Sequence, residues 1–274
     1  NIILILCAIS MIYPLWHLFV ISVSSPSQVL ADKVNLLPRG FNINAYKMLI
    51  TTNKMFRSLW NTVFITVVGT FINVSLTVLL AYPLSKKYLY GKGLVLKIIV
   101  ITMFFRGGMI PSFILIQNLN LIDTLWALML PTAVSAFYLI IMINFFKSVP
   151  DELEEAAKID GLGDLGILFR IYLPLSLHAI ATITLFYSVM RWNTFMPAIL
   201  YINDMAKYPL QVVLRQIVML DEVMGNVGSD AVLSMPPESK KAATIIFTIL
   251  PILCVYPFVQ KYFIKGVMVG SVKG

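Results

Sequence analysis

Charged residues are scarce in this chain of 274 residues. Asp, Glu, Lys and Arg together make up 12% of the sequence, whereas soluble globular domains carry about 25%. Hydrophobic residues make up 59% of the chain, and its mean hydropathy is +0.86. This composition excludes an ordinary soluble domain and predicts an all-α polytopic membrane protein.

The chain also has few residues that could form disulfides or hold a metal ion. It contains two histidines and two cysteines, Cys7 and Cys254, and both cysteines lie within apolar stretches. Such cysteines usually act as small hydrophobic residues, so we expect neither a disulfide framework nor a metal site. Because the net charge of +8 fits Lys and Arg flanking membrane spans, we predict no nucleic-acid partner.

Long apolar stretches are abundant. A helix needs about 20 apolar residues to cross the bilayer core, and six stretches reach roughly this length. We therefore predict six transmembrane helices in a single transmembrane domain over residues 1–274, with a long external loop at 203–241. The six stretches are 1–22, 58–85, 94–118, 126–146, 177–202 and 242–264.

The short connections between these stretches predict the orientation of the chain. The connection 85–93 contains Lys86, Lys87 and Lys92, whereas 117–125 contains no Lys or Arg. The positive-inside rule then places the first connection in the cytoplasm and the second outside, and both termini in the cytoplasm. Since the chain starts at Asn1 within an apolar stretch, we expect further residues before it.

A polar segment, residues 147–176, lies on the predicted cytoplasmic side. Ser148 and Asp151 have capping-box spacing, so Ser148 is expected to cap a helix. Gly161 suits the left-handed conformation that ends a helix. The segment thus predicts a helix–Gly–helix hairpin in which Leu153, Ala156 and Ala157 form one small-residue face.

The second half of this hairpin is expected to begin near Asp164, and Pro174 is expected to turn the chain into the fifth span. Its apolar side is predicted to consist of Leu165, Leu168, Phe169 and Tyr172. The first helix carries four carboxylates, which favours docking to another protein. The alternative is an amphipathic helix on the bilayer surface, but such helices usually have a basic polar face.

The hairpin resembles the Glu-Ala-Ala loop of bacterial ABC importer permeases, specifically the binding-protein-dependent carbohydrate, maltose-type branch. Trp192-Asn193 and the segments 37–41, 105–111 and 256–274 also resemble this branch, so the similarity covers nearly the whole chain. The residues of the loop that carry the resemblance are Glu155, Ala156, Ala157, Gly161, Ile171, Leu173 and Pro174.

The resemblance implies the permease of an oligosaccharide importer in the bacterial cytoplasmic (inner) membrane. Its partners would be a second, related permease, an external solute-binding protein, membrane lipid and two cytoplasmic ATPase subunits. ATP and Mg would bind the ATPase subunits, and no residue of this chain would be catalytic. The tail 265–274 would be a further contact with the ATPase. The coupling residues would be Glu152, Glu155, Ala156, Ala157, Asp160, Gly161, Ile171, Leu173 and Pro174.

Two arginines lie deep within the predicted spans. Arg106 and Arg191, with Trp192 and Asn193, are candidates for the translocation path, because buried charges in membranes often mark a pathway. Positive groups on the path would suit acidic sugars such as uronates. The alternatives are that each arginine pairs with a backbone carbonyl or a partner's carboxylate, and that Trp192 packs between helices.

Two other functions remain open from the sequence. An importer of the same fold could carry peptides or amino acids, although Trp192-Asn193 and the C-terminal segment favour sugars. A secondary transporter often shows inverted repeats, and no internal symmetry is evident here.

Overall fold

The computed structural model describes residues 2–51, 53–105, 107–223 and 236–270. Helices and their connections account for all of this described part, in which there is no β-strand. The all-α fold class is therefore confirmed. The chain divides into two compact units, the first from residues 1–61 and 208–255 and the second from residues 62–207 and 256–274.

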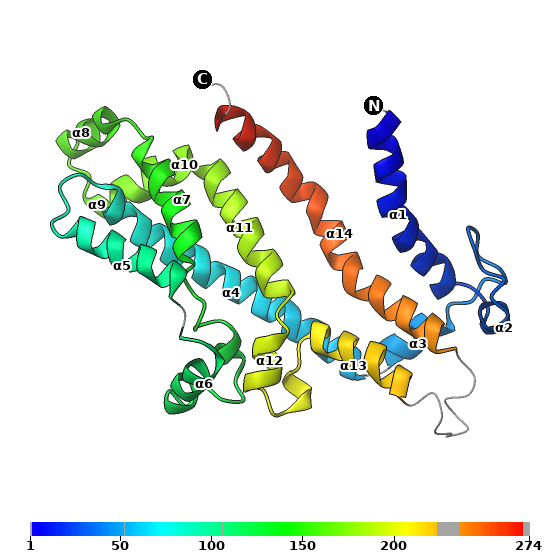
Figure 1. Cartoon of the computed structure of the whole chain (residues 1–274). Helices are drawn as coiled ribbons and strands as arrows, with labels where there is room; N and C mark the ends of the chain where they lie inside the picture. Colours follow the sequence, from blue (N-terminus) through cyan, green and yellow to red (C-terminus); the bar gives the residue numbers. More distant parts are fainter. Residues whose placement is uncertain (1, 52, 106, 224–235, 271–274) are drawn as a thin grey trace. The chain divides into compact units, whose positions relative to one another are not determined.

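The first unit contains the N-terminal helices and the beginnings of two long helices (Figure 1). Its α1 is apolar, exposed along most of its length and long enough to cross a membrane, as predicted for 1–22. The unit also includes α13, which lies in the predicted loop 203–241, while residues 224–235 of that loop lie outside the described part. Its helices are α1 (Ile2–Ser22), α2 (Pro26–Leu30), α3 (Asn44–Thr51), α13 (Leu210–Val223) and the first parts of α4 (Asn53–Ser85) and α14 (Pro237–Gly270).

The second unit contains the rest of α4 and the candidate site. Its buried core joins α4 and α7 to the polar loop and to α11, so the loop is packed onto the membrane helices. The helices up to the loop are α5 (Lys92–Phe104), α6 (Met109–Asn118), the 3₁₀ helix η1 (Leu125–Leu128) and α7 (Ala136–Lys147). The loop itself and the helices after it are α8 (Asp151–Ile159), α9 (Asp164–Ile167), the π-helix η2 (Leu168–Tyr172), α10 (Leu173–Leu175), α11 (Leu177–Trp192), α12 (Met196–Tyr201) and the 3₁₀ helix η3 (Met205–Lys207).

Three of the predicted spans are interrupted. The stretch 94–118 forms α5 and α6, which differ in direction by 117°, and Gly108 precedes α6 with a φ of +84° that favours glycine. The stretch 126–146 is an α-helix only from Ala136 onward, and 177–202 is divided between α11 and α12. Pro131 and Pro197 lie at the second and third of these breaks. Proline supplies no backbone N–H to a helix, so it favours an interruption there.

Candidate functional site

The acidic helix of the polar loop, α8, begins two residues later than its sequence indicates. Pro150 occupies the N-cap position without a side-chain cap, and the Ser148 hydroxyl donates to the carbonyl of Phe145 at 2.7 Å. The predicted cap by Ser148 is therefore wrong. A cap at Ser148 would make Val149 the first helical residue, but a residue directly before a proline disfavours the helical conformation. Acidic residues in the first turn, Asp151 among them, instead favour the positive end of the helix.

Gly161 ends α8 as predicted. Its φ is +80°, and the backbone N–H of Leu162 donates to the carbonyl of Ala157 at 2.9 Å, while that of Gly161 donates to Lys158 at 3.1 Å. This pattern is the Schellman motif of helix ends. After η2 and α10, which contains Pro174, the chain bends by 83° into α11, so the turn predicted at Pro174 is also confirmed.

The helix α8 has an inward and an outward face. Glu154 and Ala157 are buried against the rest of the second unit. Leu153 and Ala156 are exposed, so the predicted face of Leu153, Ala156 and Ala157 is wrong for Ala157. The outward face consists of Glu152, Leu153, Glu155, Ala156, Ile159 and Asp160.

The second half of the loop shows the same division. Leu168 and Tyr172 are buried in the core, whereas Leu165 and Phe169 are exposed, so these four do not share one side as predicted. Ile171 and Leu173 pack partly buried against the core. Ile159 at the end of α8 is 87% exposed. Carboxylates and large apolar side chains therefore share the outward surface of the loop.

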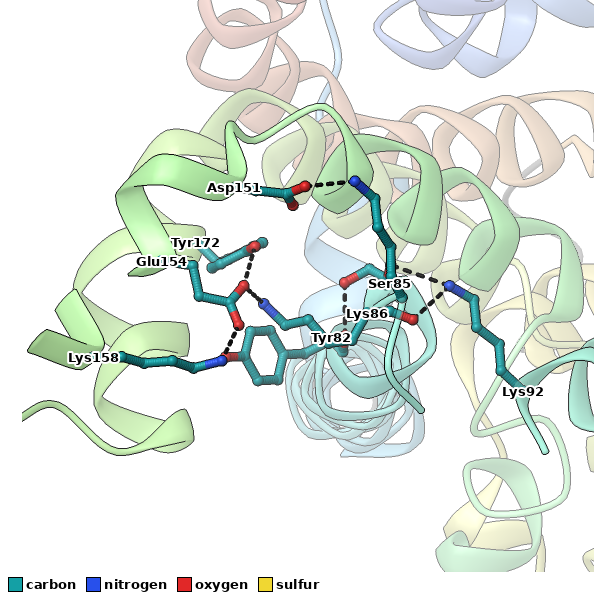
Figure 2. A network of polar contacts seen from close by, with 9 residues as sticks. Tyr82, Ser85, Lys86, Lys92, Asp151, Glu154, Lys158 and Tyr172 are labelled. Carbon is teal, nitrogen blue, oxygen red and sulfur yellow. Dashed lines mark hydrogen bonds and ion pairs between the residues drawn. The ribbon is translucent and has the colours of Figure 1, made fainter. Parts of the chain in front are cut away.

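On the inward face, Glu154 is at the centre of a polar network (Figure 2). Its carboxylate accepts hydrogen bonds from the ammonium of Lys86, from Lys158 Nζ at 2.7 Å and from the Tyr172 hydroxyl at 2.9 Å. The side chains of Lys86 and Glu154 are only 5% and 8% exposed. We call Lys86, Glu154 and Tyr172 the anchor, because they hold α8 to the end of α4.

Aromatic rings complete the surroundings of Lys86. Its Nζ lies 4.1 Å from the ring centre of Tyr82 and 3.9 Å from that of Tyr172. A cation over an aromatic face is attracted by the ring quadrupole, more strongly when it is desolvated. The ammonium is thus held by one carboxylate and two rings.

The ionisation of the anchor is set by burial and by these hydrogen bonds. Burial raises the pKa of Glu154, but the hydrogen bonds from Lys158, Lys86 and Tyr172 outweigh it and lower the pKa to about 2. Burial and the neighbouring Glu154 carboxylate raise the pKa of the Tyr172 hydroxyl. Glu154 is therefore ionised and Tyr172 protonated at physiological pH.

The other lysines of the connection 85–93 also make contacts. Lys87 pairs with Asp151 at 2.6 Å on the surface. Lys92 Nζ donates to the carbonyls of Lys86 at 2.7 Å and of Ser85 at 3.2 Å (Figure 2), which satisfies carbonyls at the end of α4. From the sequence, these lysines indicated only the orientation of the chain, and the role of Glu154 was missed. Opposite charges on the connection 85–93 and in the loop 147–176 were the available signal for the pairing.

The candidate path residue Arg191 is only 2% exposed. All three nitrogens of its guanidinium donate to neutral oxygens of α4 and of the segment before α7. The acceptors are Asn73 Oδ1 at 2.8 and 3.2 Å, Leu128 O at 2.6 Å, Met129 O at 2.7 Å, Thr132 Oγ1 at 2.9 Å and Thr132 O at 3.0 Å. We call this set the clamp. It favours the alternative that Arg191 pairs with backbone carbonyls.

The other candidate path residues are Trp192, Asn193 and Arg106. Trp192 is buried, and its Nε1 has no hydrogen-bond partner in the described part of the chain, which favours helix packing. Asn193 is exposed, and its Nδ2 donates to the carbonyl of Val189 at 2.8 Å. Arg106 lies outside the described residues.

A family model and individual proteins each match most of this chain. A sequence model of the family described as "Binding-protein-dependent transport system inner membrane component" matches residues 52–269. The chain is 48% identical over 273 residues to the polygalacturonan/rhamnogalacturonan transport system permease protein YtcP of Bacillus subtilis (strain 168), which covers 99% of this chain and 96% of that protein. It is 45% identical over 264 residues to Protein LplC of the same organism, with 96% and 90% covered.

A solved structure has a similar fold. It is described as a bacterial ABC transporter involved in the import of the acidic polysaccharide alginate, and the matched chain superposes with a TM-score of 0.89. The two chains are 35% identical, and the match covers 96% of this chain and 94% of that one.

Proposed function

This chain belongs to the family of binding-protein-dependent transport system inner membrane components, and from this premise we propose that it is the permease of an ATP-driven importer of acidic oligosaccharides. The observation that carries the substrate class is the similarity over nearly the whole chain to two permeases with related substrates. One is named for polygalacturonan and rhamnogalacturonan, and the other belongs to an importer of the acidic polysaccharide alginate.

The proposal assigns ATP hydrolysis and Mg to separate ATPase subunits. The outward face of α8 supports this assignment, because carboxylates and large apolar side chains are exposed side by side on a loop outside the predicted spans. Glu152, Glu155, Ala156 and Asp160 would meet the ATPase directly, since their side chains point away from the core. Gly161, Ala157, Ile171, Leu173 and Pro174 would shape the loop instead.

The remaining partners are those expected for the family. An external solute-binding protein would deliver the sugar, and a second, related permease would complete the path. Exposed apolar residues along α1 are available for lipid or for that second permease. Both termini would lie in the cytoplasm with the loop 147–176. The tail 265–274 remains a candidate second ATPase contact, but its side chains lie outside the described part of the chain.

The substrate class is tested by ATP hydrolysis of the purified complex with its binding protein. We expect oligogalacturonates to stimulate hydrolysis and maltooligosaccharides to leave the basal rate unchanged. Stimulation by neutral sugars or by peptides alone would contradict the proposed substrate class.

The docking face is tested by reversing one of its charges. We expect Glu155→Lys to abolish the stimulation by oligogalacturonate, because the substituted residue is exposed on the outward face. Lys33→Glu is the matched control, since it reverses an exposed charge in the predicted external loop. Normal stimulation in Glu155→Lys would contradict docking through α8.

A further inference from the structure

The helix α8 is connected to the rest of the second unit in two different ways. Through the chain, it joins α7 by residues 148–150 and joins α11 by α9, η2 and α10. Through side chains, Glu154 contacts Lys86, 68 residues earlier, directly after the end of α4. The second connection reaches a helix that is not adjacent to the loop in the sequence.

Packed aromatic rings lie beside the side-chain connection. Tyr82 of α4 and Tyr172 of η2 meet edge to face, with ring centres 5.1 Å apart. Phe146 of α7 packs against Tyr172 at 5.5 Å and against Tyr82 at 6.4 Å, also edge to face. Tyr82 and Tyr172 therefore cover the ammonium of Lys86, and Phe146 of a third segment packs against both rings.

A surface ion pair connects the same two segments and provides an internal comparison. Lys87 follows Lys86, and Asp151 begins α8, but their side chains are 85% and 60% exposed. Exposed pairs contribute little, because water and salt screen them. A buried pair resists separation, because parting its members leaves an unpaired charge in an apolar environment.

We propose that Lys86, Glu154 and Tyr172 are positioning residues that fasten α8 to the end of α4, so that the two move as one body during the transport cycle. The proposal rests on the proposed function, in which the ATPase displaces α8. That displacement then reaches α4 directly, in addition to α7 and α11. The anchor itself touches neither ATP nor sugar.

The first test measures coupling in the whole complex. We expect Glu154→Gln to reduce the stimulation of ATP hydrolysis by liganded binding protein about tenfold, with the basal rate and subunit composition unchanged. Asp151→Asn neutralises the exposed pair in the same way and is expected to alter stimulation by less than about twofold. Equal effects of the two variants would overturn the proposal.

A milder variant keeps this test decisive if Glu154→Gln does not assemble. Tyr172→Phe removes one hydrogen bond to Glu154 and retains the ring that covers Lys86. We expect an intermediate loss of stimulation in a complex that assembles normally. Unchanged coupling in Tyr172→Phe would show that this residue does not position α8 and would overturn its place in the proposal.

The second test measures the rigidity of the connection directly. Spin labels are placed at Leu79→Cys in α4 and Gly163→Cys after α8, in a complex with Cys7→Ala and Cys254→Ala. Leu79 is exposed, and a Cβ at Gly163 would meet no atom within 4 Å. We expect one narrow distance distribution, the same with and without ATP, and a broader one in Glu154→Gln.

This distance measurement separates the proposal from the proposed function. A distance that changes with ATP in the wild type, or a distribution that stays narrow in Glu154→Gln, would overturn the rigid connection. If no sugar stimulates the wild-type complex, the substrate assignment fails, while the label distances still decide whether α8 and α4 move together.

Discussion

Lys86 and Arg191 are two buried cations of the second unit that are stabilised in different ways. Lys86 lies between the faces of Tyr82 and Tyr172 and pairs with a carboxylate, Glu154. The partners of Arg191 are amide, hydroxyl and carbonyl oxygens, none of which carries a formal charge. The anchor therefore joins two charged segments, and the clamp joins one charged side chain to uncharged groups of the backbone and of two side chains.

The difference reflects the chemistry of the two side chains. An ammonium is a compact point charge, whereas a guanidinium offers five donors in a fixed planar arrangement. The carbonyls of Leu128, Met129 and Thr132 lie at the end of η1 and in the segment between η1 and α7, where the helix is interrupted. Irregular backbone within a membrane requires internal hydrogen-bond partners, and Arg191 supplies them. The clamp thus stabilises a helix break, and the anchor stabilises a contact between segments.

The largest effect is expected for Arg191→Leu. This change removes the donors to three buried acceptors, Asn73 Oδ1 and the carbonyls of Leu128 and Met129. The carbonyl of Thr132 keeps a hydrogen bond from Asn73 Nδ2 at 3.0 Å. At about 1–3 kcal/mol for each buried group left unsatisfied, the loss of stability is about 3–9 kcal/mol. Thermal unfolding of the purified complex measures it.

The same variant distinguishes the clamp from a substrate site. If Arg191 acts only in the clamp, Arg191→Leu reduces the transport of acidic and neutral oligosaccharides in equal proportion. A selective loss of uronate transport by a stable complex would contradict this account and return Arg191 to the translocation path.

A smaller effect is expected for Arg191→Lys. The charge is retained, but an ammonium has three donors in place of five, so at least two hydrogen bonds are lost. Since hydrogen bonds to charged groups contribute about 1.5 kcal/mol or more each, we expect a loss of about 3 kcal/mol. An unfolding temperature equal to that of the wild type would show that charge alone matters here and would contradict the geometric role of the guanidinium.

Gly69→Ala is expected to disturb the clamp without changing any of its hydrogen-bonding groups. A Cβ at this position would lie 3.1 Å from both Cδ and Nε of Arg191 and 3.3 Å from Cγ of Met129. Because these atoms are held by the clamp, we expect an overpacking cost of about 1–3 kcal/mol. Gly93→Ala is the matched control, since a Cβ there meets no atom within 4 Å. Equal unfolding temperatures for the two variants would argue against close packing at Gly69.

The anchor is expected to show no pH dependence near neutrality. The pKa of Glu154 lies at about 2, below its usual value of 4.5, so its contribution to stability is complete above the usual value and is lost only as pH falls toward 2. The difference in unfolding temperature between wild type and Glu154→Gln should therefore be constant between about pH 5.5 and 8.5. A difference that halves near pH 6.5 would show a carboxyl with a raised pKa.

The sequence predicted the membrane class and the family because these depend on composition and on short-range spacing. Two features can be recognised without knowing how the chain packs. They are the apolar stretches of helical length and the fixed spacing of Glu155, Ala156, Ala157, Gly161 and Pro174. The left-handed conformation of Gly161 was expected from the same local rules and was found with a φ of +80°.

The sequence did not predict which side chains of the loop face inward. In a helix of nine residues, a carboxylate and an alanine at neighbouring positions can each be buried or exposed. Which of them is buried depends on the segment that packs against the helix. Glu154 is buried because Lys86, 68 positions earlier, supplies its counter-charge. For Arg191 the sequence left two alternatives open, a place on the path or pairing with backbone carbonyls. Its acceptors, at Asn73 and near Pro131, are distant in sequence and carry no charge, so they could not be identified.

Uptake of a radiolabelled oligogalacturonate into proteoliposomes tests the central claim most directly. The whole complex is reconstituted with its binding protein on one side and ATP on the side of α8. We predict accumulation that requires ATP, is abolished in Glu155→Lys and is reduced about tenfold in Glu154→Gln. Uptake without ATP, or ATP-driven uptake unaffected by both changes, would contradict the claim.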